Sequence, residues 1–409
     1  MNLLYNIGIY FYQLLIVVSS LFNNKAKLWI EGRKNWESKL KEAVKGSNKV
    51  IWFHAASLGE FEQGRPLIEK LKREESDVFI LLTFFSPSGY EIQKNYKGAD
   101  YVCYLPSDTK KNAGKFIEIT KPKQAIFIKY EFWYNYLSQL KQRDIPLYLL
   151  SGIFRKDQVF FKFYGAWFRR QLESFTRFYI QDQTSVDLIK SIGYNNVLLT
   201  GDTRFDRVIE ISETSSEILE IKNFVKDNYC LVVGSSWPVE EEMLAEYINN
   251  NPNQKYIIAP HEIDKRHIKE IESRLNVSYQ LWSEYKKDKE AVVLIVDSIG
   301  LLSSIYKYAD IAYVGGAFGS GLHNILEAAV YGIPVLFGPK ISKFQEAYDL
   351  IDFNAAFSIS DKEELFQKLN VLKNQKTLSE NMGKNAKSFI YKSKGASKKV
   401  YEQIRQNGL

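Results

Sequence analysis

The chain has 409 residues, 45% of them hydrophobic and 25% charged, with a net charge of +7 and two cysteines. This composition excludes a disordered or fibrous protein, and a chain of this length usually divides into two domains. Cys103 and Cys230 each lie in an apolar run, which disfavours a disulfide scaffold or a cysteine metal site, and the positive charges form no dense basic stripe that would favour nucleic acid as a partner.

The first predicted element is an uncharged apolar run over 3–22, which is long enough, at about 20 residues, to cross the hydrocarbon core of a membrane as a helix. Lysines and arginines follow this run and none precedes it, so the rest of the chain is expected on the cytoplasmic side. We therefore predict an N-terminal membrane anchor over 1–24, which either spans the membrane or lies in its interface. Four polar residues leave an ordinary buried or interfacial helix as the alternative: Asn6, Gln13, Ser19 and Ser20.

From residue 49 onward, short β-rich runs alternate with amphipathic helical stretches, and the alternation restarts at Tyr229. This pattern predicts two α/β domains with doubly wound, Rossmann-like parallel sheets, and such folds bind ligands at the carboxyl ends of their strands. The expected segments are an N-terminal domain, a charged helix-prone linker, a C-terminal domain and a last helix that packs back on the N-terminal domain: 25–208, 209–227, 228–385 and 386–409.

The segment HAASLGEFEQGRPLI follows the first strand of this series, and it is expected to place Glu60 in the loop between that strand and the next helix. A carboxylate on a rigid loop can take the proton from an attacking hydroxyl group, so Glu60 is the candidate general base. Glu62 could instead be the base while Glu60 caps the helix, or both acids could be ordinary helix N-terminal charges. His54 could equally pack at the strand end or carry a proton.

The most informative stretch of the second half is 309–339, where a β-run ends at Val314 and a glycine-containing loop leads into a predicted helix from Leu322. Glycines let backbone N–H groups approach an anion, and a helix N-terminus adds partial positive charge, so this loop is expected to bind a phosphate. Glu327 could accept hydrogen bonds from a ribose diol, with His323 and Asn324 at the same end. The alternative is a tight turn in which Glu327 only stabilises the helix.

These segments, in this order, resemble the 3-deoxy-D-manno-octulosonic acid (Kdo) transferases, a family of lipopolysaccharide core glycosyltransferases with two Rossmann-like domains of the GT-B type. HAASLGE is similar to the family's catalytic motif, and GGAFGSGLHNILEAA to its donor-binding signature. Leu322 and Ile325 stand where the family usually has Gly and Pro, and the arginines expected in the glycine loop and before His261 are missing. GSSWPVEEE and GDTRFD are similar to two further family segments.

The resemblance implies a role for each matched residue. Glu60 is the implied general base, while Glu131 and Arg204 are implied to stabilise the transition state. From the residues alone, Glu131 could be a surface acid, and Arg204 could pair with Asp202 or Asp206. The implied contacts to the donor nucleotide and its sugar are Ser235, Ser236, Pro260, His261, Ile299, Gly300, Leu301, Asn324, Ile325, Leu326 and Glu327.

The implied reaction is the inverting transfer of Kdo from CMP-Kdo to a lipid A precursor such as lipid IVA, at the cytoplasmic face of the inner membrane. The N-terminal domain would bind the acceptor and the C-terminal domain the CMP-sugar. No cofactor is implied, and because the sequence has no Asp-x-Asp pair and its four histidines are widely separated, no metal site is expected. The rivals are a GT-B transferase or epimerase that uses a UDP-sugar, and a non-catalytic membrane protein that binds nucleotide sugars.

Overall fold

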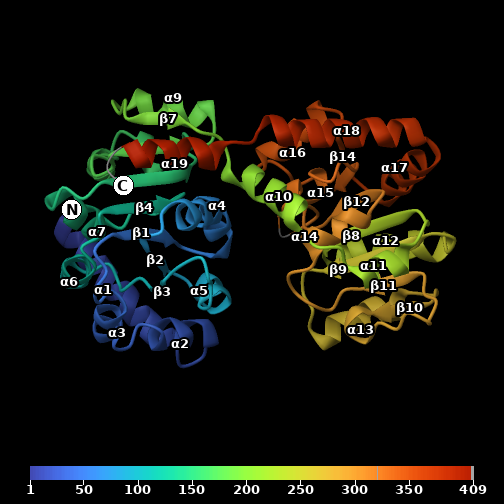
Figure 1. The fold of residues 1–409 in the computed structure, drawn as a ribbon, viewed down its shortest axis with the longest axis horizontal. Coiled ribbons are helices and arrows are strands. Elements are labelled where there is room, and N and C mark those ends of the chain that lie inside the picture. Colours follow the sequence, from blue (N-terminus) through green and yellow to red (C-terminus); the bar gives the residue numbers. More distant parts are fainter. Residues whose placement is uncertain (320, 407–409) are drawn as a thin grey trace. The chain divides into compact units, whose positions relative to one another are not determined.

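A computed structural model describes residues 1–319 and 321–406, and its contacts divide the chain into two compact units (Figure 1). Unit 1 holds Met1–Arg207 together with the segment from Lys394 onward, and unit 2 holds Val208–Ser393. The finer boundaries expected from the sequence, including a linker over 209–227, stay a prediction. Each unit is described by itself.

Unit 1 is built on a seven-stranded, wholly parallel sheet in the order β3-β2-β1-β4-β5-β6-β7. Its strands are β1 (Val50–Ala55), β2 (Phe79–Phe84), β3 (Tyr101–Tyr104), β4 (Gln124–Ile128), β5 (Leu147–Gly152), β6 (Arg177–Ile180) and β7 (Val197–Leu199). Its helices are α1 (Asn2–Ser19), α2 (Asn24–Glu31), α3 (Trp36–Ala43), α4 (Leu58–Glu74), α5 (Pro87–Gln93), α6 (Lys110–Thr120), α7 (Tyr134–Gln142), η1 (Val159–Phe161), α8 (Ala166–Leu172), α9 (Gln183–Ser191) and α19 (Ala396–Gln406), while α10 (Thr203–Thr214) carries the boundary between the units.

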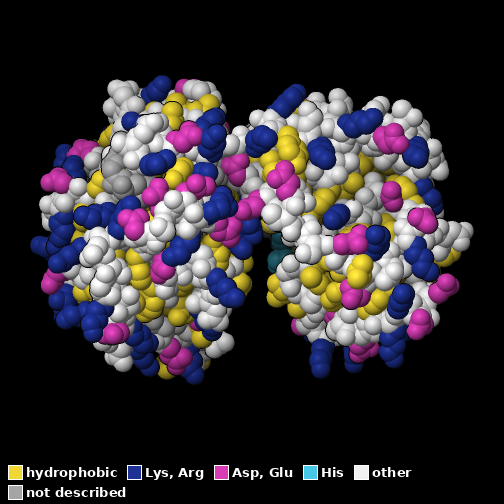
Figure 2. Space-filling model, in the orientation of Figure 1, with side chains coloured by type: hydrophobic (Ala, Val, Ile, Leu, Met, Phe, Trp, Pro, Cys, Tyr) yellow, Lys and Arg dark blue, Asp and Glu magenta, His cyan; other side chains and the backbone are white. Residues whose placement is uncertain are grey.

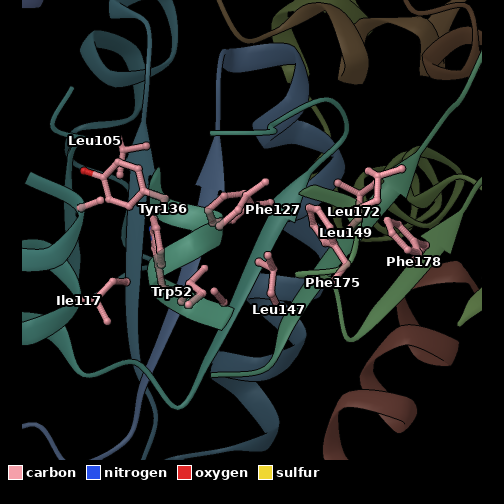
Figure 3. Close-up of a cluster of buried hydrophobic side chains, with 14 of the residues drawn as sticks. Trp52, Leu105, Ile117, Phe127, Tyr136, Leu147, Leu149, Leu172, Phe175 and Phe178 are labelled. Atoms are coloured by element: carbon pink, nitrogen blue, oxygen red, sulfur yellow. The ribbon is translucent and has the colours of Figure 1, made fainter. Parts of the chain in front are cut away.

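The inner strand β1 of this sheet is buried on both faces. All six residues of β1 are buried, and because side chains alternate along a strand, Trp52 joins one hydrophobic cluster and Phe53 the other. Figure 3 shows the first cluster, in which Trp52 lies among Phe127, Tyr136 and their neighbours. This packing fixes the end of β1, from which the candidate base follows.

The chain returns to unit 1 through α19, which packs on α4. Val400, Tyr401 and Ile404 of α19 belong to the cluster that contains Phe53. Asp206 supports the start of this helix, because its carboxylate accepts hydrogen bonds from the backbone N–H of Gly395 (2.5 Å) and of Ser397 (2.7 Å).

Unit 2 holds a second parallel sheet, in the order β10-β11-β9-β8-β12-β13-β14. Its strands are β8 (Cys230–Ser236), β9 (Lys255–Pro260), β10 (Tyr279–Leu281), β11 (Val293–Ile295), β12 (Ile311–Val314), β13 (Val335–Phe337) and β14 (Ala356–Ser358). Its helices are α11 (Leu219–Val225), α12 (Pro238–Asn250), α13 (Lys265–Arg274), η2 (Trp282–Glu284), α14 (Leu302–Ile305), η3 (Tyr306–Tyr308), α15 (Leu326–Ala329), α16 (Gln345–Asp352), α17 (Lys362–Asn374) and α18 (Lys376–Lys392).

Both sheets have the strand order of a doubly wound fold, in which the chain direction across the sheet reverses at one point. The reversal lies between β1 and β4 in unit 1 and between β8 and β12 in unit 2. Loops that follow the strands on either side of such a point diverge and leave a crevice for ligands. The two α/β domains expected from the sequence are confirmed, and so is an apolar N-terminal helix, α1, which is long enough to cross a membrane.

Candidate active site

Glu60 lies directly beyond the end of β1, beside the reversal point of the unit 1 sheet. The expectation that it lies in a loop is wrong, because α4 begins at Leu58 and Glu60 is in its first turn. The hydroxyl of Ser57, the N-cap residue, donates a hydrogen bond of 2.5 Å to Glu60 Oε2. This bond orients a half-buried carboxylate that makes no ion pair with the described residues. Such a carboxylate can accept a proton from a ligand at the strand ends.

Glu62, the alternative base, has different surroundings on the same helix. Its carboxylate pairs with Arg65 at 3.4 Å and with Arg207 at 3.9 Å. The Glu62 carboxylate is therefore engaged by two guanidinium groups of the protein itself. The local geometry therefore favours Glu60 over Glu62 for proton transfer.

Glu131 follows β4, the strand on the other side of the reversal point. It is only 6% exposed, so the alternative of a surface acid is wrong. Glu131 Oε2 lies 3.0 Å from His54 Nε2 and accepts a hydrogen bond of 2.5 Å from Trp133 Nε1. His54 is fully buried, and its Nδ1 lies 2.9 Å from the hydroxyl of Thr83. His54 and Glu131 thus form a buried polar pair that holds the loop after β4.

Arg204 lies near the same edge of the sheet as Glu60. Arg204 forms an ion pair with Asp202 at 2.6 Å, which is one of the two structural pairings that the sequence left open. The other candidate partner, Asp206, accepts a hydrogen bond at the start of α19. Burial raises the pKa of Tyr130, which follows β4, and the charges of Arg155, Glu60, Asp182 and Arg204 act on it as smaller effects of mixed sign. These four charged residues therefore lie near enough to Tyr130 to act on it electrostatically.

The backbone at these strand ends is strained at two positions. Lys129, directly after β4, has φ of 62°, and Ser151, near the end of β5, has φ of 55°. Residues with a side chain rarely adopt this left-handed conformation, and it concentrates at functional sites. Ser151 is fully buried, and its hydroxyl is 3.0 Å from that of Thr203, the residue before Arg204.

In unit 2 the end of β8 shows the same feature. Ser235 has φ of 52°, and Ser236 is fully buried with its hydroxyl donating to Glu241 Oε1 at 2.8 Å. Glu241 is also buried and lies 2.9 Å from His267 Nε2. Ser236 is therefore occupied within the protein, and of the two predicted serines only Ser235 is partly exposed.

The glycine loop after β12 is bound by a side chain of the protein itself, the carboxyl group of Glu240. Glu240 is fully buried, and its Oε1 accepts a hydrogen bond of 2.8 Å from the N–H of Gly316, while the N–H of Phe318 also acts on it. Burial raises the pKa of Glu240, and these backbone N–H groups oppose that shift. Gly316 needs to be glycine because its φ is +98° and a Cβ there would collide with the carbonyl oxygen of Gly321. The loop is shaped as expected, but two of its N–H groups already hold a carboxylate.

Three aromatic rings stack between the loops after β8, β9 and β12. Trp237 lies 4.6 Å from the exposed ring of His261 with an interplanar angle of 22°, and His261 lies 4.5 Å from His323. Trp237 Nε1 donates to His323 Nε2 at 3.1 Å, and burial, with a smaller effect of His261, lowers the pKa of His323 to about 4. The sequence-based reasoning did not include Trp237, although its position directly after a strand end was a usable signal.

The remaining donor-site candidates lie on the same edge of the sheet. Asn324 Nδ2 donates to Glu327 Oε1 at 3.0 Å, while Ile325 and Leu326 are buried and pack the loop. The helix predicted from Leu322 is wrong, because α15 begins at Leu326 and has only four residues. One turn of helix supplies less positive charge to a phosphate than the expected longer helix.

Pro260 ends β9, and Ile299, Gly300 and Leu301 form the loop after β11. Ile299 is 84% exposed and Gly300 has φ of +93°, so this loop presents its backbone to solvent. Since β11, β9, β8 and β12 are consecutive in the sheet, all the unit 2 candidates gather at one edge. Within 1–319 and 321–406, no group of three or more His, Cys, Asp or Glu side chains could hold a metal ion.

Known proteins match this chain over most of its length. The family model described as 3-deoxy-D-manno-octulosonic-acid transferase (kdotransferase) matches residues 34–207. A 3-deoxy-D-manno-octulosonic acid transferase from Aquifex aeolicus is 29% identical over 340 residues, which cover 81% of this chain and 88% of that protein. Another from Rickettsia felis is 27% identical over 354 residues, covering 82% of this chain and 74% of that protein. The chain is therefore similar in sequence to the Kdo transferases.

These matches confirm the resemblance found in the sequence, and they indicate a glycosyltransferase. Among solved structures, UDP-GlcNAc 2-epimerase from Neisseria meningitidis superposes with a TM-score of 0.63, covering 88% of this chain and 100% of that chain at 15% identity. At this identity the similarity shows the fold alone, and it agrees with two Rossmann-like domains of the GT-B type.

Proposed function

We propose that this chain transfers Kdo from CMP-Kdo to a lipid A precursor with inversion, with Glu60 as the general base. The acceptor hydroxyl loses its proton to Glu60 while its oxygen bonds to the anomeric carbon, and the bond from that carbon to the CMP phosphate breaks. A single base suffices for this displacement. The observation that carries the proposal is the position of Glu60 at the reversal point of the unit 1 sheet, oriented by Ser57 and free of ion pairs with the described residues.

Glu131 and Arg204 have supporting roles in this proposal. Glu131 is held by His54 and Trp133, so it acts as a positioning residue for the loop that carries Tyr130, rather than as a second base. Arg204 is held by Asp202, and its charge acts on Tyr130, as the charge of Glu60 also does. A guanidinium there can bind the carboxylate of the Kdo group.

Unit 2 is proposed to bind CMP at the edge formed by β11, β9, β8 and β12. The exposed ring of His261 and the backbone of Ile299–Leu301 suit a planar base, and the Asn324–Glu327 pair suits a ribose diol. The N–H of Gly316 already donates to Glu240, so the phosphate is expected to bind other donors. We expect one of them to be the hydroxyl of Ser235, the residue whose own backbone is strained. The site uses no metal ion in this proposal, because the leaving CMP carries its charge on a single phosphate group, which hydrogen-bond donors of the protein can hold.

The proposed location is the cytoplasmic face of the inner membrane, where a lipid A precursor is accessible. The apolar helix α1 and the lysines that follow it support this location. Partners in this proposal are therefore the CMP-Kdo donor, the lipid acceptor and the membrane itself.

Replacing the base tests the proposal. We expect Glu60→Gln to lower kcat by about 10²–10⁴-fold, the usual contribution of a general base, while CMP affinity stays unchanged because unit 2 is untouched. Turnover would be measured with freshly prepared CMP-Kdo and lipid IVA, and CMP binding by calorimetry.

The matched control is Glu62→Gln, which changes the same functional group two residues away on the same helix. It should keep most of kcat, although it loses the ion pairs with Arg65 and Arg207. The proposal fails if Glu60→Gln keeps wild-type turnover, or if Glu62→Gln loses as much activity with its fold intact.

A further inference from the structure

Helix α1 is attached to unit 1 along one face. Its half-buried residues follow helical spacing and form one stripe: Tyr5, Asn6, Ile9, Gln13, Ile16 and Ser20. Near the N-terminus, Trp167 Nε1 donates to Asn2 Oδ1 at 2.6 Å, and Asn135 Nδ2 donates to Asn6 Oδ1 at 3.0 Å. Polar side chains of α1 thus bond to α7 and α8 rather than pointing away from the protein.

The strongest of these attachments is at Tyr5. Its hydroxyl donates a hydrogen bond of 2.6 Å to Asp108 Oδ2, and Asp108 is only 3% exposed. Asp108 also accepts hydrogen bonds from the backbone N–H of Asn135 and of Tyr136, each at 3.1 Å. Removing α1 would leave a buried carboxylate without one of its donors, which is costly.

Aromatic packing extends this attached face in both directions. The Tyr5 ring lies 5.4 Å from Tyr134 and 5.6 Å from Trp167, and further along the helix Tyr12 stacks on Phe85 at 6.3 Å. Contacts from Asn2 to Tyr12 cover more than half of the helix length. A helix held in this way along a water-soluble α/β domain cannot also be surrounded by lipid.

The opposite face of α1 is apolar and uncovered. Its side chains, all more than half exposed, are Leu3, Leu4, Ile7, Tyr10, Phe11, Leu14, Leu15, Val17 and Val18, and Leu21 and Phe22 in the turn after the helix are exposed as well. Two further apolar side chains are exposed before α8, where Phe163 is 95% and Tyr164 63% exposed. An uncovered apolar surface of this size marks an interaction site.

Exposed cations lie at both ends of this apolar face. Lys25 and Lys27 follow α1, while Arg170 and Tyr164 line an open groove with the first residues of the helix. Lys110 and Lys111 are the first two residues of α6, and they follow Asp108 and Thr109 in the chain. Figure 2 shows Lys and Arg side chains gathered along the left edge of unit 1, where Figure 1 labels α1 and α6. Apolar residues bordered by cations fit the headgroup region of an anionic membrane.

We infer that α1 does not cross the membrane but lies in the plane of its cytoplasmic interface, where its exposed face enters an anionic phospholipid layer and its other face stays bound to unit 1. The membrane is the partner in this inference, so it deepens the proposed location, but it does not depend on Kdo transfer. It also brings unit 1, which carries Glu60, to the membrane surface without a linker.

The side of the membrane on which the N-terminus lies distinguishes a helix in the interface from a helix that spans the membrane. The full chain with an N-terminal epitope tag would be expressed and sealed inside-out membrane vesicles prepared, so that the cytoplasmic face is outside. We expect protease to remove the tag without detergent, together with the body of the protein. A tag that is protected until detergent is added, while the body is digested, overturns the inference.

Substitutions on the exposed face test which residues contact lipid. The double variant Leu14→Glu and Leu15→Glu should weaken flotation with phosphatidylglycerol-containing vesicles by about tenfold or more. The control Ile92→Glu changes a residue of α5 that is also 59% exposed, and it should bind vesicles as the wild type does.

Two other outcomes would overturn the inference. The double variant could bind vesicles normally but lose a dimer seen by light scattering, in which case a second copy covers this face. The wild type could fail to bind any vesicle. Turnover with a detergent-solubilised acceptor is measured separately, so a failure of membrane binding and a failure of the proposed reaction are distinguishable.

Discussion

At the scale of residues, the buried and half-buried carboxylates differ in what they can do. Glu131 is held by His54 and Trp133, Glu240 by backbone N–H groups, and Glu241 by His267 and Ser236. Each of these is committed to holding a loop in place. Glu60 has a single hydroxyl donor and partial exposure, so it is the carboxylate best placed to exchange a proton with a ligand.

The stacked histidine of unit 2 gives a pH-dependent prediction. Burial, with His261 nearby, lowers the pKa of His323 to about 4, whereas an unfolded chain takes up this proton near its ordinary value of about 6.5. The unfolded state therefore binds more protons between these values, and the His323 contribution to stability falls as pH drops from about 6.5 to about 4.

NMR of protein with labelled histidine rings would check this prediction, since the chain has only four histidines. We expect one ring to keep its neutral shift down to about pH 4, and His323→Asn to remove that signal. The prediction is wrong if the signal lost in His323→Asn titrates near pH 6.5.

The sequence indicated which strand end several residues follow, but it did not indicate which side chains contact them. Glu60, Asn324 and Glu327 could be placed at strand ends because the motifs themselves follow β-runs. The role of Glu240 could not be found in this way, because its partner Gly316 lies far along the chain and the two meet only through the sheet order. The ring stack of Trp237 with His261 and His323 depends on the same tertiary neighbours.

At the scale of elements, the alternation of apolar runs was enough to predict most strands, because central parallel strands are buried on both faces. The strand β10 at the sheet edge was not predicted, since its sequence Tyr-Gln-Leu has a glutamine between its two apolar residues and forms no apolar run. The starts of α4 and α15 were each misplaced, the first too late and the second too early. Apolar spacing alone does not show where hydrogen bonding begins, which is why helix ends are hard to predict.

Helix α19 gives an element-scale prediction about stability. Asp206 accepts two backbone hydrogen bonds at the start of this helix, and an amide at this position keeps only one acceptor oxygen. We expect Asp206→Asn to lower the free energy of unfolding of unit 1 by about 1 kcal/mol, the usual effect of losing a helix cap. Trypsin should also cleave faster at Lys398 and Lys399, within α19.

Asp187→Asn is the control for this experiment, because Asp187 is an exposed residue of unit 1 that accepts only from the side chain of Gln183. It should leave both urea unfolding and cleavage of α19 unchanged. Equal stability of Asp206→Asn and the wild type would contradict the role given to this carboxylate.

At the scale of the whole molecule, the two units are both built on a seven-stranded parallel sheet but carry different functional groups. Each sheet reverses its winding at one point, and the functional candidates follow the strands on either side of that point. In unit 1 these candidates include acids and an arginine, and in unit 2 they include hydroxyl, aromatic and backbone groups together with the Asn324–Glu327 pair. This division agrees with a base in one unit and a nucleotide site in the other, and the restart of the strand pattern at Tyr229 made it visible in the sequence.

The central proposal is that this protein moves Kdo from CMP-Kdo to a lipid A precursor. The most direct measurement is mass spectrometry of lipid IVA after incubation with the full chain and either freshly made CMP-Kdo or a panel of UDP-sugars. The account predicts that the lipid gains the mass of Kdo with CMP-Kdo alone, and that Glu60→Gln abolishes most of this product. A lipid left unchanged by CMP-Kdo but glycosylated from a UDP-sugar would contradict it.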